Sequence, residues 1–175
     1  MQVDIDPVPR LQPLCLPERG AVLEKTAVAL LSHLPRHIAQ RELNVIGADL
    51  DLPAENMQTR EITSSPGPGN AVTVVIRCRH ITEVFTGFGM PGLRAETVAS
   101  RLVERVRRYL TAGVPVGEHL ADQLLLPMAL AGSGSYVTLQ PSLHTTTNIA
   151  VLQQFMTLQI DCREIGPDRW YIALD

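Results

Sequence analysis

Aromatic residues are scarce in this 175-residue chain, in which Phe, Tyr and Trp together make up 4% of the sequence. Its hydrophobic cores must therefore be built from the abundant aliphatic residues Leu, Val, Ile and Ala. No apolar run reaches the roughly 18 uncharged residues that a membrane-spanning helix needs, so no membrane partner is expected. The opening segment MQVDIDPVPR lacks the basic and apolar regions of a signal peptide. These absences predict a cytoplasmic protein.

Cysteine and net charge are also low. Cys15, Cys78 and Cys162 are widely spaced and form no CxxC motif, which favours reduced thiols over disulfides. The formal net charge of −3 gives no general attraction to nucleic acid. Two glycine-containing segments, 67–69 and 132–134, lack the Lys-Ser or Lys-Thr that follows the glycines of a P-loop. Both are therefore predicted to be turns.

The middle of the chain, residues 15–112, is predicted to form an α+β domain of its own. Strands are predicted at 21–31, 57–62, 71–78 and 80–87. The segment at 71–78 alternates poorly, which favours a strand buried on both faces. Helices are predicted over 35–48, with Pro35 in the first helical position, and over 94–111.

The last part of the chain, residues 113–175, predicts a smaller unit in the order helix–strand–helix–strand–strand. Helices are predicted at 118–130 and 146–154, and strands at 136–139, 158–163 and 170–174. Alternation of Val3 and Ile5 with polar residues predicts another strand over residues 1–9, and Pro13 and Pro17 then mark a linker. Residues 1–14 are therefore an orphan strand with a linker. The fold class is α+β, with two small modules that each combine a sheet with two helices.

The segment from residue 117 to 155 has the most distinctive pattern of polar side chains. A polar strip at residues 118–123 opens a predicted helix, and His144 lies in a Ser/Thr/Asn-rich loop that opens the next one. Free N–H groups at a helix start attract phosphate, and a neutral imidazole can attack phosphorus. A structural interpretation is also open. A single loop histidine usually forms structural hydrogen bonds, and Glu118 with Asp122, four residues apart, usually form a solvated first turn.

These motifs resemble the RNA 3'-terminal phosphate cyclases. The sequence GEHLADQ at residues 117–123, followed after a turn by His144 and then Thr147-Asn148-Ile149, is characteristic of that family. Other blocks that resemble the family occur upstream in the same order, at residues 34–42, 67–70 and 107–110. The resemblance covers the carboxy-terminal half of such an enzyme. The Gly-rich opening and the phosphate-binding arginines of the amino-terminal half have no counterpart in this sequence.

The resemblance implies a reaction and a set of site residues. His144 would attack the α-phosphate of ATP, release pyrophosphate and hold AMP as a phosphoramidate. The AMP would pass to an RNA 3'-phosphate, and the 2'-hydroxyl would then expel it to leave a 2',3'-cyclic phosphate. The nucleotide-binding residues implied in this way are His119, Leu120, Ala121, Asp122 and Gln123. Residues 15–112 would be a module inserted into the catalytic body, and residues 113–175 the last repeat of that body.

The resemblance also implies cofactors and partners. ATP would be used with a divalent metal, magnesium or manganese, whose ligands lie mostly in the amino-terminal half. No metal-ligating residue is predicted in this chain. His33 and His37 are four residues apart, but Pro35 between them disfavours a shared helical face and therefore a metal site there. RNA 3'-phosphate ends are the partner implied for the complete enzyme, and the isolated chain is expected to be inactive.

We also expect a homo-oligomer, because the last unit would lack its neighbouring repeats. An uncovered apolar sheet invites association between chains. The strands expected to be involved carry Val3, Ile5, Val137, Leu139, Ile160, Ile172 and Leu174.

Two other functions stay open at this point. A non-catalytic cyclase-like scaffold in ribosome assembly would share the fold, although such relatives lack the nucleophilic histidine that His144 matches. A stable remnant whose inserted module binds a partner is the other possibility. Adding the amino-terminal half in trans separates them, because only an enzyme would regain ATP consumption.

Overall fold

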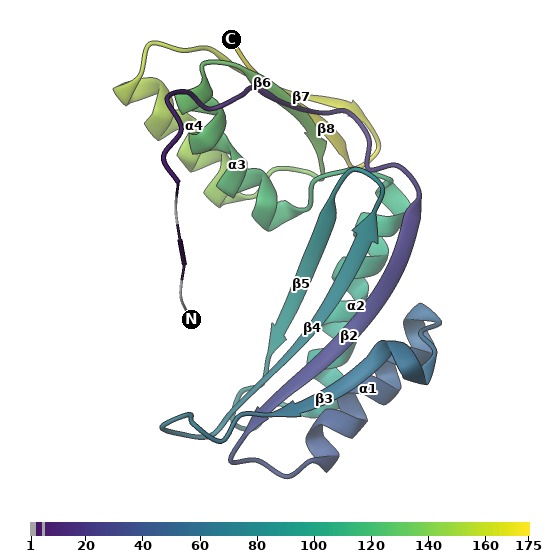
Figure 1. Ribbon diagram of the computed structural model, residues 1–175. Helices are drawn as coiled ribbons and strands as arrows, with labels where there is room; N and C mark the ends of the chain where they lie inside the picture. The colour runs from purple at the N-terminus through teal and green to yellow at the C-terminus, as the bar shows by residue number, and fades with distance from the viewer. Residues whose placement is uncertain (1–2, 5) are drawn as a thin grey trace. The chain divides into compact units, whose positions relative to one another are not determined.

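The computed structural model describes residues 3–4 and 6–175 (Figure 1). They form two compact units, a middle unit of Arg19–Gly113 and a terminal unit made of the chain before Arg19 together with Val114–Asp175. Each unit contains one four-stranded sheet and two α-helices, which confirms the predicted α+β class. Within the described part of the chain, no helix is both long enough and apolar enough to cross a bilayer.

The middle unit has the predicted strands and helices. Its elements are β2 (Val22–Ser32), α1 (His37–Leu50), the short 3-10 helix η1 (Ala54–Asn56), β3 (Met57–Glu61), β4 (Gly69–Cys78), β5 (Thr82–Phe88) and α2 (Ala95–Ala112). The sheet order is β3-β2-β4-β5, with β2 and β3 parallel and the other pairs antiparallel. Helix α1 starts two residues after Pro35. The carbonyl of that proline instead accepts a hydrogen bond from the Ile38 N–H, at 3.1 Å.

Both helices of the middle unit cover the same face of its sheet (Figure 1). Alternate residues of β4, among them Val72, Val74 and Ile76, are fully buried. The residues between them are half-buried or exposed, as Arg77 is. The prediction that this strand is buried on both faces is therefore wrong, because an antiparallel sheet with helices on one side leaves its other side partly open.

The two ends of the middle unit are joined by Arg19. Its guanidinium donates to the carbonyl oxygens of Tyr109 and Leu110, at 3.0 and 3.1 Å. The same group lies over the Tyr109 ring, 5.3 Å from the ring centroid, in a cation–π contact. The chain therefore enters this unit beside the last turn of α2, where it leaves.

The terminal unit has the predicted order of elements and one additional strand. It contains β1 (Leu14–Leu16), α3 (Glu118–Ala131), β6 (Gly134–Thr138), α4 (Leu143–Phe155), β7 (Ile160–Gly166) and β8 (Arg169–Leu174). Its sheet order is β1-β6-β8-β7. The β7–β8 hairpin turns where predicted, and Asp168 adopts a left-handed conformation there, with φ 52°.

The additional strand corrects the prediction for the start of the chain. Val3, Asp4 and residues 6–9 form no strand, and Ile5 lies outside the described residues. The strand is instead β1, in the segment predicted to be a linker, and it pairs in parallel with β6. Pro13 and Pro17 flank this strand without interrupting it, since a proline that donates no hydrogen bond is tolerated at a strand end.

Helices α3 and α4 pack over one face of the terminal sheet. The core beneath them includes Leu125, Met128, Tyr136, Ile172 and Leu174. Val137 and Leu139 are also buried. The expectation of an uncovered apolar sheet is therefore wrong at Val137, Leu139, Ile172 and Leu174, which are all buried. Of the other strand residues named above, Val3 is exposed, Ile160 is half-buried and Ile5 lies outside the described residues. Exposed apolar side chains of this unit lie on its helices at Leu126, Leu130, Leu143, Val151 and Phe155, on β7 at Ile165, and in the opening segment at Val3, Val8 and Leu11.

Candidate functional site

The predicted polar strip forms the first turns of α3, and Asp122 joins it to α4. The Asn148 side-chain amide donates to Asp122 Oδ1 at 2.9 Å and to the Asp122 carbonyl oxygen at 3.2 Å. Both residues are half-buried. A carboxylate that accepts a hydrogen bond is held in a fixed orientation, so this contact fixes the Asp122 side chain at the α3–α4 contact.

His144 is the second residue of α4, where the sequence predicted a loop. The helix begins at Leu143 because Ser142 caps it, with its hydroxyl accepting a hydrogen bond from the Thr145 N–H at 3.3 Å. His144 and Asn148 are four residues apart and therefore lie on the same face of the helix. The amide that binds Asp122 thus lies one helical turn from the exposed imidazole.

The rest of the strip divides into outward and inward residues. His119 and Gln123 are exposed and share one face of α3. Leu120 packs against the core of the unit. Ala121 is 1% exposed, and its carbonyl accepts a hydrogen bond from the Tyr136 hydroxyl at 2.6 Å. Of the five predicted nucleotide contacts, the two apolar ones therefore anchor the helix, while the polar ones point outward or toward α4.

The electrostatic setting of His144 favours a negatively charged ligand. The first N–H groups of a helix have no carbonyl partner within it, and together they carry partial positive charge. The first turn of α4 contains no acidic residue that would neutralise this charge. An anion beside the imidazole would therefore meet free N–H groups of the Leu143–His144 backbone.

Tyr136 holds the polar strip in place through its hydrogen bond to the Ala121 carbonyl. Burial raises its pKa above the ordinary value, and the negative charges of Cys162 and Asp122, when ionised, raise it further. The phenol therefore stays protonated and keeps its hydrogen bond to Ala121. Neither this contact nor the one from Asn148 could be assigned from sequence. For the Asn148 contact, the only signal in the sequence was the four-residue spacing of Asn148 from His144. For the Tyr136 contact, the sequence contained no signal.

Titratable side chains do not gather into a metal centre in the described residues. Across residues 3–4 and 6–175, no group of three or more His, Cys, Asp or Glu side chains is placed to hold a metal ion. The three cysteines are free, with Cys78 buried and Cys15 exposed.

Comparison with known proteins identifies the family of this chain. A profile described as "RNA 3'-terminal phosphate cyclase (RTC), insert domain" matches residues 17–111, nearly the whole middle unit. The chain is also similar to proteins named RNA 3'-terminal phosphate cyclase. It is 42% identical over 161 residues to the one from Koribacter versatilis. The aligned region covers 92% of this chain and 45% of that relative.

Other relatives agree. The protein of the same name from Pseudomonas fluorescens is 45% identical over 156 residues, covering 89% of this chain and 46% of the relative. The one from Salmonella enteritidis is 41% identical over 158 residues, covering 90% and 46%. The chain therefore belongs to the RNA 3'-terminal phosphate cyclase family. Its middle unit is the insert domain of that family. It spans about half the length of the relatives that it matches.

Proposed function

We propose that this chain is the carboxy-terminal part of an ATP-dependent RNA 3'-phosphate cyclase and that it carries the nucleophile, His144. The observation that carries the proposal is the α3–α4 contact, in which Asn148 joins Asp122 to the face of α4 that bears His144. The names of the relatives supply the substrate class, an RNA 3'-terminal phosphate. The presence of His144 favours an enzyme over a non-catalytic scaffold of the same fold.

The proposed reaction has three steps. The neutral imidazole of His144 attacks the α-phosphorus of ATP, so that a P–N bond forms, the bond to the β-phosphate breaks and pyrophosphate leaves. An oxygen of the RNA 3'-phosphate then attacks the same phosphorus, the P–N bond breaks, and the imidazole leaves in the neutral form in which it attacked. In the last step the 2'-hydroxyl attacks the 3'-phosphorus, loses its proton and expels AMP, which leaves the 2',3'-cyclic phosphate.

The other site residues would bind and orient the nucleotide. Asp122, held by Asn148, would fix the position of α3 against α4 and present a polar anchor near the imidazole. His119 and Gln123 are exposed on one face of α3 and would contact the base and ribose. A divalent metal bound with the triphosphate would supply charge neutralisation there. The metal ligands are expected outside this chain, and no step is assigned to them.

The isolated chain is expected to have little activity, because groups that bind the triphosphate would come from the amino-terminal half. In the cell we expect a cytoplasmic protein that acts on RNA ends. Joining this chain with an amino-terminal half, supplied in trans from a relative, should therefore restore ATP consumption.

Covalent labelling tests the nucleophile. With ATP labelled at the α-phosphate, the reconstituted enzyme should hold AMP through a bond that is labile to acid and stable to alkali. His144→Ala and His144→Asn should both abolish the label. His33→Ala, a change at an exposed histidine of the middle unit, should keep it. A label that persists in His144→Ala would show that another residue is the nucleophile.

A further inference from the structure

The middle unit contains a pocket that no step of the proposed reaction uses. Its volume is about 550 Å³, within the roughly 300–1,000 Å³ range of small-molecule sites. The lining comes from the start of α1, the segment around Pro68–Asn70, the loop at 89–93 and the start of α2. Two of these segments belong to the blocks at 34–42 and 67–70 that resemble the cyclase family.

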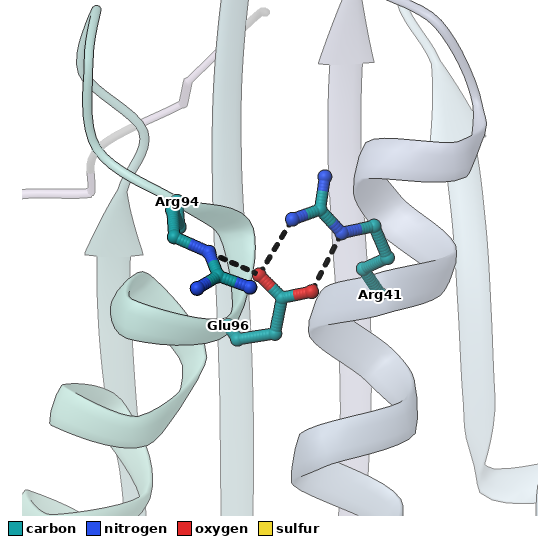
Figure 2. Close-up of polar contacts among 3 residues, drawn as sticks. All are labelled: Arg41, Arg94 and Glu96. Carbon is teal, nitrogen blue, oxygen red and sulfur yellow. Dashed lines mark hydrogen bonds and ion pairs between the residues drawn. The ribbon is translucent and has the colours of Figure 1, made fainter.

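The pocket carries an excess of positive charge at Arg41 and Arg94. Arg41 forms two hydrogen bonds with the Glu96 carboxylate, each 2.6 Å long, and Arg94 Nε lies 3.7 Å from the same group. Figure 2 shows the carboxylate between the two guanidinium groups. The Arg41 hydrogen bond is the main reason that the pKa of Glu96 falls to about 2, so this carboxylate is always ionised near neutral pH. One carboxylate therefore balances two cations, and the side chain of Arg94 is 77% exposed.

Two helix starts add to this charge. The starts of α1 and α2 both line the pocket, through His37 and Ile38 on one side and Arg94 and Ala95 on the other. Neither N-cap residue, Arg36 or Arg94, forms a side-chain capping hydrogen bond. The positive ends of two helix dipoles therefore face one pocket, and Glu96 in the first turn of α2 offsets part of that charge.

The surroundings of Glu42 favour its neutral form, which would not cancel this positive charge. It is fully buried, and burial raises its pKa, although the hydrogen bond from the Asn70 amide to Glu42 Oε2, 3.0 Å long, opposes the rise. Among the described residues, Glu42 Oε1 and Asn70 Oδ1 are buried without a donor. A proton on Glu42 would supply the donor that this pair lacks, so the neutral form fits the site.

The absence of a side chain at Gly89 leaves room for Asn70 beside Glu42. A Cβ at position 89 would lie 2.5 Å from Asn70 Oδ1, closer than any real contact. A side chain at this position would push Asn70 out of its place beside Glu42. The Glu42–Asn70 floor of the pocket therefore depends on a glycine in the loop after β5.

The remaining walls are apolar. They include Leu34, Ile38, Met90, Leu93 and Val98. A free phosphate or sulfate ion would fill only a small part of such a volume and would leave these walls without a partner. The ligand that fits has an oxyanion at the arginines and an uncharged organic body against the apolar walls.

We propose that this pocket binds a nucleotide through its phosphate group, either as a free mononucleotide or as the phosphorylated end of an RNA strand. A phosphate has enough acceptor oxygens to bind both arginines and the helix N–H groups. The choice of a nucleotide over other organic phosphates rests on the proposed function. The phosphate contact rests on Arg41, Arg94 and the two helix starts alone.

Calorimetric titration of the full chain tests the proposal. The probes are uridine 3'-monophosphate, uridine, inorganic phosphate and a short RNA that ends in a 3'-phosphate. We expect the monophosphate to bind more tightly than either uridine or phosphate. Arg94→Gln should weaken its binding by about tenfold or more, which is the usual worth of a hydrogen bond to a charged group.

Matched variants locate the site. Arg101→Gln removes an exposed arginine of α2 that lies outside the pocket, and it should leave binding unchanged. His144→Ala should also leave it unchanged, which separates this proposal from the reaction proposed above. Tighter binding of the RNA than of the monophosphate assigns the site to an RNA end, and equal binding assigns it to the nucleotide itself.

Four results would overturn the proposal. Three of them are no binding of uridine 3'-monophosphate at millimolar concentration, equal binding of inorganic phosphate and the monophosphate, and unchanged binding in Arg94→Gln. Loss of binding in His144→Ala alone would place the ligand on α4 and would overturn it too. Intact binding here combined with no labelling of His144 in the reconstituted enzyme would reject only the proposed reaction.

Discussion

Asp122 and Glu118 lie one turn apart on α3, yet their surroundings differ. Asp122 accepts a hydrogen bond from Asn148 on α4, whereas Glu118 belongs to the first turn of its helix, where a carboxylate complements the helix dipole. The sequence alone could not separate the two, because their difference depends on how α3 packs against α4. The resemblance to the cyclases selected Asp122 as a nucleotide contact, and this stays a prediction.

This difference predicts unequal effects of two similar substitutions. In the reconstituted enzyme, Asp122→Ala should slow the adenylation of His144 by about tenfold to several hundredfold, since it removes a hydrogen-bonded charge near the nucleotide. Glu118→Ala should have a much smaller effect. Single-turnover labelling with ATP measures both. Equal losses would mean that this turn is purely structural.

Glu42 provides a second residue-scale prediction, on stability. The amide of Glu42→Gln can donate to Asn70 Oδ1 while still accepting from Asn70 Nδ2, so the variant should be as stable as the natural protein at pH 7 or more stable. Glu42→Ala should lose about 1–3 kcal/mol, because it leaves the buried amide without its acceptor. Urea unfolding measures both. Equal losses in the two variants would contradict the neutral form of Glu42.

The pH dependence of Glu42 has a definite sign. Because burial raises its pKa above the ordinary value of 4.5, the folded state keeps a proton that the unfolded chain has already lost. The stability of the natural protein should therefore fall, relative to Glu42→Gln, as pH rises from the ordinary carboxyl pKa through the raised one. A difference that does not change between pH 4 and pH 7 would contradict the raised pKa.

At the scale of elements, the sequence predicted best where apolar spacing was regular. The helix α2 follows from Val98, Leu102, Val106 and Tyr109, all of which are buried. The sequence placed the start of α4 three residues too late. The residues that follow Leu143 are polar, so no apolar spacing marked the start of the helix. Its true start depends on the Ser142 cap. Strand β1 is only three residues long and is defined by its pairing with β6, which no local pattern contains.

The Ser142 cap gives an element-scale prediction. Ser142→Ala should destabilise the terminal unit by about 1 kcal/mol, because the Thr145 N–H loses its acceptor, whereas Ser142→Gly should cost only a few tenths. Urea unfolding, followed by the helical signal, measures the difference. Indistinguishable stabilities of the serine and alanine proteins would show that α4 does not need this cap. In the reconstituted enzyme, the alanine variant should also label His144 more slowly, because the imidazole lies in the capped turn.

At the scale of the whole molecule, the exposed apolar residues of the terminal unit predict association. Leu143 is 85% exposed and Phe155 is 83% exposed, both on α4. We expect a homodimer or larger assembly through this helix, since an apolar surface of this kind usually marks an interface. Sedimentation at micromolar concentration should show it, and Phe155→Glu should convert it to a monomer.

Phe88→Glu is the matched control, because Phe88 is 68% exposed but lies in the middle unit. This variant should sediment as the natural chain does. A natural chain that is a clean monomer, with both units folded, would reject the prediction. The ground for it differs from the one expected from sequence, because Ile172 and Leu174 are buried in the core of the unit and its most exposed apolar side chains lie on α4.

The Arg19 contacts have a consequence for how the chain can change. Because one guanidinium ties the entry of the middle unit to the carbonyls of Tyr109 and Leu110, the unit begins and ends at the same place. Domains with adjacent ends can be inserted into a host, or excised from it, with little disturbance of the host fold. The middle unit can therefore be deleted as a whole. A short linker that joins residue 18 to residue 114 should replace it, and β1 would stay paired with β6 in the terminal sheet.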